Sequence, residues 1–344
     1  MIKADNILVH LPNWVGDAVM STPALRALRE NYPTSKITYI GKPITLDTVG
    51  LQFCDAQIPI KSKSLGATLK LASQLRAGRF DLGILFPNSF RSAALFALGK
   101  VKNIVGYKRD MRSIFLSAGP IPPKDSSGKF KPYPALDYYV DLLEFAEIPV
   151  KSREMEIPTE PAGDAQMREL FDCSGIDQAR PIVTLNPGAS NNFAKCWPAD
   201  KFAAVADQAF EKLGAQIIIN AAPGEENLAR EIQQTMKNPV ALNLADHKNS
   251  IPLLKSLLKN SSALITNDTG ARHIAAALGT ALVTIFISTD PVWAEINCPK
   301  ERIVTVNTPF TPCEMGDENH KKFTDGVTVD MVLHALEELL NLEK

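Results

Sequence analysis

The sequence has no excess of either charge, few cysteines and no long apolar run. Its 344 residues include 37 lysines and arginines and 38 aspartates and glutamates, a balance that argues against a general nucleic-acid binder. The five cysteines are scattered and form no CxxC pair, which argues against a disulfide framework and a zinc ribbon. No window approaches the ~18 to 20 apolar residues that cross a bilayer, and no signal-peptide apolar region is present. We therefore expect a soluble cytoplasmic protein that can still contact a membrane surface.

Several catalytic signatures are missing as well. No GxGxxG follows the first apolar run, so the chain lacks the phosphate loop of a dinucleotide-binding dehydrogenase. Walker A, GxSxG and HExxH motifs are absent. There is no Asp-x-Asp pair, the usual Mg²⁺ holder for a nucleotide diphosphate, so we expect no metal and no cofactor. A phosphate site in this chain would use lysine and helix amides instead.

Short apolar runs alternate with longer stretches of helical period, the pattern of βαβ units and a parallel sheet. In the first half, strands are expected at residues 6–10, 36–41, 57–60, 81–86 and 103–107, and helices at 24–31, 65–77, 89–98 and 135–146. In the second half, the expected strands are 181–186, 216–221, 240–244, 263–266 and 282–286, and the expected helices are 198–213, 225–236, 251–260, 270–278 and a closing helix within 327–344. The predicted fold class is α/β, with two Rossmann-like doubly wound layers.

Proline, glycine and charge accumulate between residues 149 and 181, which marks a linker with room for one helix. We place the domain boundary near residue 175, so the expected domains are residues 1–175 and 176–344. Two such layers would face each other across a cleft. Because open α/β sheets bind ligands at the carboxyl ends of their strands, the loops that follow the strands are where chemistry is expected.

One loop of the second half, within "LITNDTGARHIAAALG", has the features of an anion site. Asp268 follows a strand, and Thr269 and Gly270 open a helix, which places backbone N–H groups, a hydroxyl and a glycine at a helix amino terminus suited to a diphosphate. Asp268 can instead cap this helix with its side chain. His273 lies one turn later on the same side, either as a buried packing residue or as a donor to phosphate.

A second loop reads "PGASNNFAKCWP" and supplies two amides, Asn191 and Asn192, and a single lysine, Lys195. A lysine before a helix can neutralise a leaving phosphate, although most lysines are simply solvated. Glu225 and Glu226 begin a later helix. They either favour the helix dipole or accept hydrogen bonds from ribose hydroxyls, as acidic residues do at nucleotide sites.

The first half supplies a carboxylate and a group of cations at comparable positions. Asp17 ends the stretch "PNWVGD" after the first expected strand, either as part of a bulky turn or as a group held there for chemistry. Polar and basic residues also follow the last two expected strands of this half: Asn88, Arg91, Lys108, Arg109 and Arg112. They are either ordinary solvated side chains or a receptor for an anionic substrate.

Four segments, taken in order, resemble one known family. They read "ILVHLPNWVGDAVMSTPALRALRENYP", "LFPNSFRSAALFALGKVKNIVGYKRDMRSIFL", "LNPGASNNFAKCWPADKFAAVAD" and "ITNDTGARHIAAALGTALVTIF". The family is that of the lipopolysaccharide heptosyltransferases, glycosyltransferase family 9, and the first two segments look most like the enzymes that add the second heptose of the inner core. The resemblance implies a GT-B fold, with an acceptor-binding domain first and a domain for the nucleotide-sugar donor second.

The resemblance also implies an activity. Heptose would pass from ADP-L-glycero-D-manno-heptose to the heptosyl-Kdo-lipid A inner core, with inversion at the anomeric carbon. Matched by motif, Asp17 falls on the family's proposed general base and Lys195 on the lysine that binds the donor's phosphates. The family's donor loop matches Asp268, Thr269, Gly270 and His273. The ribose contact would be Glu225 or Glu226. Expected partners are therefore ADP-heptose, a lipid A-core acceptor and the cytoplasmic face of the inner membrane, without nucleic acid.

The chain departs from the family's pattern in several places. Cys196 replaces an arginine, Ala271 and Arg272 replace leucine and methionine, and Ile287 replaces a glycine. The branched isoleucine is expected to narrow the donor pocket. Three alternatives stay open: a family 9 enzyme with another nucleotide sugar or core acceptor, a nucleotide-sugar hydrolase or epimerase on the same fold, and a non-catalytic sugar-nucleotide binding module.

Overall fold

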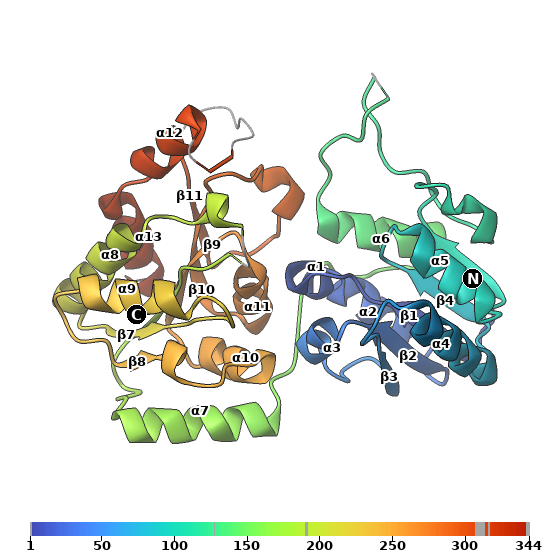
Figure 1. The fold of residues 1–344 in the computed structure, drawn as a ribbon, viewed down its shortest axis with the longest axis horizontal. Helices are drawn as coiled ribbons and strands as arrows, with labels where there is room; N and C mark the ends of the chain where they lie inside the picture. Colours follow the sequence, from blue (N-terminus) through green and yellow to red (C-terminus); the bar gives the residue numbers. More distant parts are fainter. Residues whose placement is uncertain (1, 127, 190–191, 307–313, 316, 342–344) are drawn as a thin grey trace. The chain divides into compact units, whose positions relative to one another are not determined.

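The chain folds into two compact units, each built around one parallel sheet (Figure 1). The computed structural model describes residues 2–126, 128–189, 192–306, 314–315 and 317–341. The first unit comprises Met1–Pro158 and Val292–Asn297, and the second comprises Thr159–Pro291 and Cys298–Lys344. The prediction of two α/β layers is confirmed.

The first unit contains a five-stranded sheet in the order β3-β2-β1-β4-β5, with every pair parallel. Its strands are β1 (Asn6–His10), β2 (Lys36–Gly41), β3 (Ala56–Pro59), β4 (Leu82–Leu85) and β5 (Asn103–Gly106). Its helices are α1 (Val15–Met20), α2 (Thr22–Asn31), α3 (Pro43–Val49), α4 (Leu65–Gly78), α5 (Phe90–Leu98), the 3-10 turn η1 (Arg112–Phe115) and α6 (Ala135–Phe145). The strand order reverses between β1 and β4, which makes their carboxyl ends the topological switch point where such sheets bind ligands.

Strand β1 lies at the centre of this sheet because its residues are apolar on both faces. Residues 7–9 are all 0% exposed, as expected for a parallel strand that is covered on both sides. The register pairs His10 with Leu85 of β4, so the two strands end level with each other. The segment after His10 therefore leaves the sheet directly at the switch point.

The second unit contains a six-stranded parallel sheet in the order β11-β10-β9-β6-β7-β8. Its strands are β6 (Ile182–Asn186), β7 (Gln216–Ile219), β8 (Leu242–Asn243), β9 (Ala263–Asn267), β10 (Ala281–Ile285) and β11 (Glu301–Val304). Its helices are α7 (Pro161–Ser174), η2 (Phe193–Lys195), α8 (Ala199–Leu213), α9 (Glu226–Thr235), η3 (Leu244–Asp246), α10 (Ile251–Lys259), α11 (Gly270–Leu278), α12 (Glu318–Gly326) and α13 (Val329–Asn341). The 3-10 turn η4 (Pro291–Ala294) precedes β11 in the chain, but all of it except Pro291 belongs to the first unit. Its order is that of dinucleotide-binding sheets, and its switch point lies between β6 and β9.

Helix α7 belongs to the second unit, so the units divide between Pro158 and Thr159 rather than near residue 175. Met167 and Phe171 of α7 pack in a buried cluster with apolar residues of α10, and the two helices lie side by side in Figure 1. The proline-rich and charged composition of this stretch hid a helix that is attached to the second core. The sequence placed the boundary after that helix, whereas the packing places it before.

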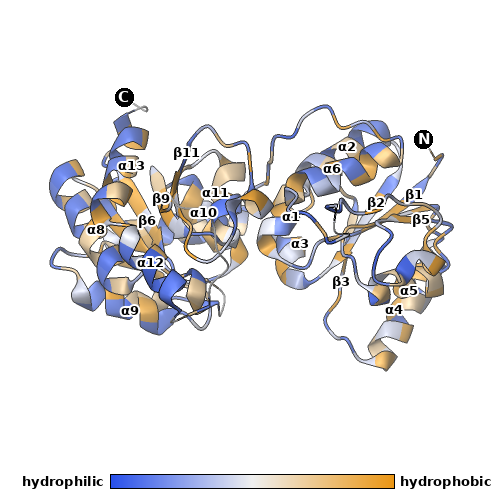
Figure 2. Ribbon diagram, turned by 90° about the horizontal axis from the view of Figure 1, so that it is seen from above, coloured by the Kyte–Doolittle hydropathy of each residue, from blue (hydrophilic) through white to orange (hydrophobic). Residues whose placement is uncertain are grey.

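The sequence did not predict helices α1, α3 and α12 or strand β11, all of which are short. The predicted closing helix corresponds to α13. Figure 2 shows the second sheet's strands β6 and β9 as hydrophobic and the charged helix α12 as hydrophilic. Within the described residues, every helix is too short or too polar to span a bilayer.

Candidate active site

Asp17 lies in the first turn of α1, directly after the central strand of the first unit. The backbone is extended at Trp14 (φ −113°, ψ 148°) and then enters the helix, whose amino terminus favours a carboxylate. The Asp17 Oδ1 atom accepts a hydrogen bond of 2.9 Å from the hydroxyl of Tyr139 on α6. Burial and the charge of Asp17 hold the pKa of Tyr139 well above its usual range, so the phenol remains a donor. Asp17 is therefore half-buried and oriented by this donor, and its role as a general base stays a prediction.

Arg112 is buried, which corrects the expectation that it belongs to a surface receptor for an anion. Its side chain is 0% exposed. The guanidinium donates to the Asn88 side-chain oxygen (3.0 Å), to the Tyr107 carbonyl (2.8 Å) and to the Pro87 carbonyl. Burial lowers the pKa of Arg112 to about 10, so it stays charged at neutral pH. Arg112 therefore ties together the loops that follow β4 and β5 and orients Asn88.

The other predicted cations of the first unit lie nearer the surface. Arg91 is exposed and donates to the Thr68 hydroxyl (2.6 Å). Lys108 is exposed, and the guanidinium of its neighbour Arg109 lies 4.3 Å from the ring centroid of Phe130. Lys108 and Arg109 follow β5 closely, so positive charge stands at the carboxyl end of that strand. Their contact with an acceptor stays a prediction.

In the second unit, amide side chains link the carboxyl ends of β7, β6 and β9. Asn249 donates to Asn220 (2.8 Å), and Asn220 donates to Asn186 (2.7 Å). Asn186 in turn donates to the hydroxyls of Thr266 (3.0 Å) and Thr269 (3.2 Å). A buried network whose members satisfy one another is rigid. We did not select these amides from the sequence, although an asparagine at or just after the end of a strand was the available signal.

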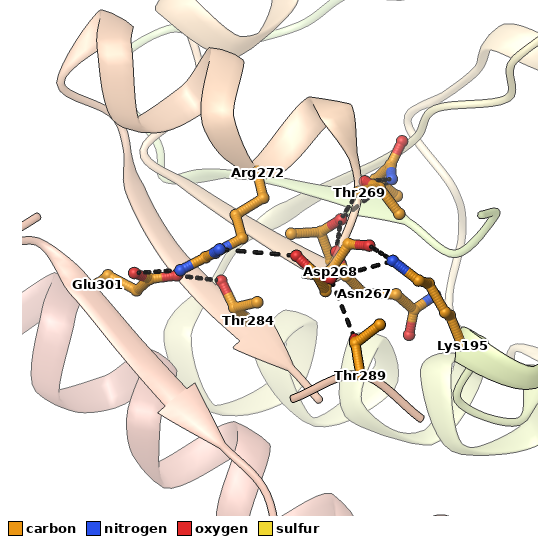
Figure 3. A network of polar contacts seen from close by, with 10 residues as sticks. Lys195, Asn267, Asp268, Thr269, Arg272, Thr284, Thr289 and Glu301 are labelled. Carbon is orange, nitrogen blue, oxygen red and sulfur yellow. Dashed lines mark hydrogen bonds and ion pairs between the residues drawn. The ribbon is translucent and has the colours of Figure 1, made fainter. Parts of the chain in front are cut away.

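The centre of the second site is a buried carboxylate, that of Asp268 (Figure 3). Its Oδ2 atom accepts hydrogen bonds from the Lys195 ammonium (3.1 Å) and the Thr289 hydroxyl (3.0 Å). Arg272 Nη1 lies 3.6 Å from Oδ1. Burial alone would raise the pKa of Asp268, but the positive charges of Lys195 and Arg272 outweigh it, and the pKa lies below its usual range. The structure thus brings Lys195 and Asp268 together, while the prediction that both bind a donor stays a prediction.

The N-cap of α11 is Thr269, not Asp268, which corrects one of the two interpretations of that carboxylate. Thr269 has extended backbone (φ −140°, ψ 178°), and its side chain makes no capping hydrogen bond. The Asp268 oxygens instead face Lys195, Arg272 and Thr289. The first N–H groups of a helix have no partner within the helix, and anion binding by the backbone from Gly270 onward stays a prediction.

His273 lies in the first turn of α11 and is 4% exposed. Its Nδ1 atom is buried, and among the described residues it has no hydrogen-bond partner. Burial, reinforced by the charge of Arg272, lowers the pKa of His273 to about 3, so the ring is neutral at physiological pH. An unsatisfied polar atom in a buried ring points to a missing partner, as a bound phosphate oxygen would be.

Glu225 and Glu226 begin α9, and both accept hydrogen bonds from the preceding turn. Glu225 accepts from the Ala222 amide (3.2 Å), and Glu226 accepts from the Gly224 amide (2.9 Å). A Cβ atom on Gly188 would lie 2.0 Å from the Glu225 carboxylate, so this carboxylate lies against the loop that leads to Lys195. Glu226 instead lines a pocket near the ends of β7 and β8, together with Ala221, Pro223, Leu244, His247, Lys248 and Asn249.

The sequence also predicted donor contacts at Asn191 and Asn192 and a narrowing of the donor pocket by Ile287. Asn191 lies outside the described residues, and Asn192 is exposed. Ile287 is 1% exposed and packs in the hydrophobic core of the second unit, so the expectation that it narrows a donor pocket is wrong. An apolar side chain next to β10 is more stable in that core than in a polar site. Within the described residues, no cluster of histidine, cysteine and acidic side chains could hold a metal ion.

Comparisons with known proteins identify the family and the fold. The profile of "Glycosyltransferase family 9 (heptosyltransferase)" matches residues 68–323. The lipooligosaccharide heptosyltransferase 2 of Haemophilus influenzae is 28% identical over 350 residues, which cover 97% of this chain and 99% of that protein. A lipopolysaccharide heptosyltransferase 3 of Escherichia coli is 29% identical over 301 residues, covering 81% and 82%. The structure of E. coli ADP-heptose lps heptosyltransferase II has a TM-score of 0.81 at 23% identity, covering 98% and 99%.

The two α/β units have the GT-B fold, and the protein is a glycosyltransferase. The family profile matches well over half of the chain. The chain belongs to glycosyltransferase family 9.

We expect replacement of His273 by glutamine to reduce the loss of stability in acid. The folded state holds His273 neutral down to a pKa of about 3, whereas the unfolded state binds a proton below about pH 6.5. Stability is therefore lost as the pH falls from about 6.5 toward 3. Between pH 7.5 and 5.5, wild type should lose about 1.4 kcal/mol more than His273→Gln. Urea unfolding at both pH values measures this, and the exposed His334→Gln is the control. An equal loss in wild type and His273→Gln would contradict the neutral, buried ring.

Proposed function

We propose that the protein transfers L-glycero-D-manno-heptose from ADP-heptose to the heptosyl-Kdo-lipid A inner core of lipopolysaccharide. One observation carries the proposal: the ammonium of Lys195 lies 3.1 Å from the buried Asp268, beside the open amino terminus of α11. A lysine and helix amides at a switch point are suited to the diphosphate of a sugar nucleotide. The names of the relatives supply the sugar, and the likeness to heptosyltransferase 2 over nearly the whole chain favours the second heptose.

The reaction is a single displacement with inversion. Asp17 removes the proton from the acceptor hydroxyl as that oxygen attacks the anomeric carbon. The bond from the anomeric carbon to the phosphate oxygen breaks, and the departing ADP carries the negative charge. Lys195 and the amides that begin α11 stabilise this charge, so the reaction needs no covalent intermediate.

The rest of the donor and the acceptor have separate contacts in this proposal. The phosphates meet Thr269, Gly270 and His273. Glu225 or Glu226 accepts from the ribose, and the pocket lined by Glu226 and Asn249 takes the nucleoside half. The acceptor contacts Asn88, Arg91, Lys108 and Arg109. Because that acceptor is a lipid, the protein works at the cytoplasmic face of the inner membrane as a peripheral protein.

A turnover assay with two acceptors tests the proposal. The purified protein, given ADP-heptose, should release ADP and add one heptose to heptosyl-Kdo-lipid A but not to Kdo-lipid A. If ADP inhibits the transfer more strongly than UDP and GDP do, the nucleotide of the donor is ADP. Product on Kdo-lipid A, or only on a core that already carries two heptoses, would instead assign the chain to a heptosyltransferase of type I or III. The 29% identity to a heptosyltransferase 3 makes the latter the second candidate.

Asp17→Asn removes the base while preserving the shape of the side chain. We expect the turnover rate to fall about 10² to 10⁴-fold, the usual contribution of general-base catalysis, with the dissociation constant of ADP unchanged. Single-turnover kinetics and calorimetric titration with ADP measure the two quantities. Asp172→Asn on the exposed face of α7 makes the same substitution in a helix that carries no candidate site residue and should retain full activity. A wild-type rate for Asp17→Asn would remove Asp17 from the mechanism.

Lys195→Ala removes the cation that meets the phosphates. We expect ADP to bind more weakly and turnover to fall by about 10² to 10³-fold, because the charge that develops on the leaving group loses its partner. Lys212→Ala is the matched control, since that exposed lysine on α8 contacts only Gln208 among the described side chains. An unchanged affinity for ADP in Lys195→Ala would contradict the assigned role.

A further inference from the structure

Arg272 is a buried cation that the proposed mechanism leaves without a role. Its side chain is 0% exposed, and it donates to Glu301 of β11 from Nε to Oε1 (2.7 Å) and from Nη2 to Oε2 (3.0 Å). The Thr284 hydroxyl donates to the same carboxylate (2.6 Å). The ion pair of Arg272 and Glu301 lies directly behind the candidate donor loop.

The remaining guanidinium nitrogen of Arg272, Nη1, faces Asp268 in the candidate donor site. Nη1 lies 3.6 Å from Asp268 Oδ1, while Asp268 Oδ2 accepts from Lys195 (3.1 Å) and Thr289 (3.0 Å). Figure 3 shows Arg272 between Glu301 and Asp268, with Lys195 on the far side of Asp268. Four charged side chains thus form a line of alternating sign, from Glu301 at one end to Lys195 at the other.

Lys195, the last side chain of this line, has to exchange Asp268 for a phosphate when a donor binds. Lys195 can neutralise a phosphate only by giving up part of its interaction with Asp268. A buried carboxylate that loses its cation is strongly destabilised, and it responds either by retaining the lysine or by binding a proton. Arg272 prevents both responses, because its two bonds to Glu301 fix the guanidinium in position whether or not the donor is bound.

We propose that Arg272 is a positioning residue that compensates the charge of Asp268, so that Lys195 is released to the diphosphate of the donor. The inference rests on the proposed function, because it takes the ligand to be a nucleoside diphosphate. Glu301 has the supporting role of orienting Arg272. Neither residue needs to touch the ligand.

Loss of Arg272 should make ADP binding depend on the ionisation of Asp268. The groups that face Asp268 are Lys195 of η2, Arg272 and His273 of α11, and the Thr289 hydroxyl after β10. His273 is neutral above about pH 4, since burial lowers its pKa to about 3. Without Arg272, an ionised Asp268 retains Lys195 and ADP binds weakly. Once Asp268 is protonated at lower pH, Lys195 is released and affinity returns.

The test compares Arg272→Met, Glu301→Gln and the double variant R272M/E301Q by calorimetric titration with ADP at pH 8.0 and 5.5. The double variant removes both buried charges, so no orphaned Glu301 titrates. We expect it to bind ADP about 10-fold more weakly than wild type at pH 8.0 and within about 3-fold at pH 5.5. Glu301→Gln, which leaves the charge of Arg272, should remain within about 3-fold at both. The phosphates of ADP also titrate in this pH range. Because this affects wild type and variants equally, it cancels when each dissociation constant is divided by that of wild type at the same pH.

If the pair of Arg272 and Glu301 served only to stabilise the fold, the ADP affinities of the variants would follow a different pattern. Both single variants would then weaken binding alike, and the double variant would recover it. That result, or a deficit in the double variant that is the same at both pH values, overturns the proposal. If R272M/E301Q does not fold by thermal denaturation, R272Q/E301Q, whose amides can pair, replaces it with the same expectations.

A measurement without nucleotide separates this inference from the proposed function. The carboxyl ¹³C signal of Asp268, assigned with Asp268→Asn, should titrate at a higher pH in the double variant than in wild type. If wild type failed to bind ADP, the proposed donor would be wrong, but this titration would still decide the role of Arg272. An unchanged titration of Asp268 in the double variant overturns the inference whatever nucleotide binds.

Discussion

A buried carboxylate has to be compensated by positive charge, and in the second unit this requirement organises the candidate site around Asp268. Lys195 comes to it from the loop after β6, Arg272 from α11, and Thr289 from the loop after β10. Three loops that are distant in sequence are thus fixed at one point. The same interactions hold a cation, helix amides and a neutral histidine beside one another, which is what a diphosphate requires.

The strand order is what makes such a meeting possible. Parallel strands end at the same edge of a sheet. Between β6 and β9 the order in which strands are added to the sheet reverses, and this leaves room for the loops that follow the two strands. The first unit uses the same arrangement with the charges inverted. There the buried group is the cation Arg112, which binds carbonyl oxygens and Asn88 across the loops after β4 and β5. Asp17 stands at the neighbouring strand end, held by Tyr139.

The layers of the fold were predictable because the alternation of apolar runs and helical periods is written locally in the chain. The loops that carry Asp17, Lys195 and Asp268 could be located for the same reason, since each follows a strand. What each side chain does there depends on partners that are far away. Tyr139 is separated from Asp17 by 122 residues, and no local pattern indicates their contact.

Burial of charge was the property that the sequence concealed most. Arginines are mostly exposed, so Arg112 was taken for a surface cation, whereas the carbonyl oxygens around it stabilise the guanidinium in the interior. Asp268 was a reasonable N-cap by its place before a helix, but nearby cations are stronger partners than the amides of the turn. The domain boundary failed similarly, because packing of α7 on α10 outweighs a linker-like composition.

The pair of Arg272 and Glu301 shows why burial of charge is informative about function. Replacing a buried ion pair by apolar residues is often neutral or stabilising, so the stability of the second unit alone gives no reason to keep one at this position. An electrostatic reason is available at the site itself. A fixed positive charge behind Asp268 balances that carboxylate independently of Lys195, and it does so from a position that leaves the open end of α11 to the ligand. In this proposal, the buried charge of Arg272 therefore determines how freely the half-buried Lys195 can bind a ligand.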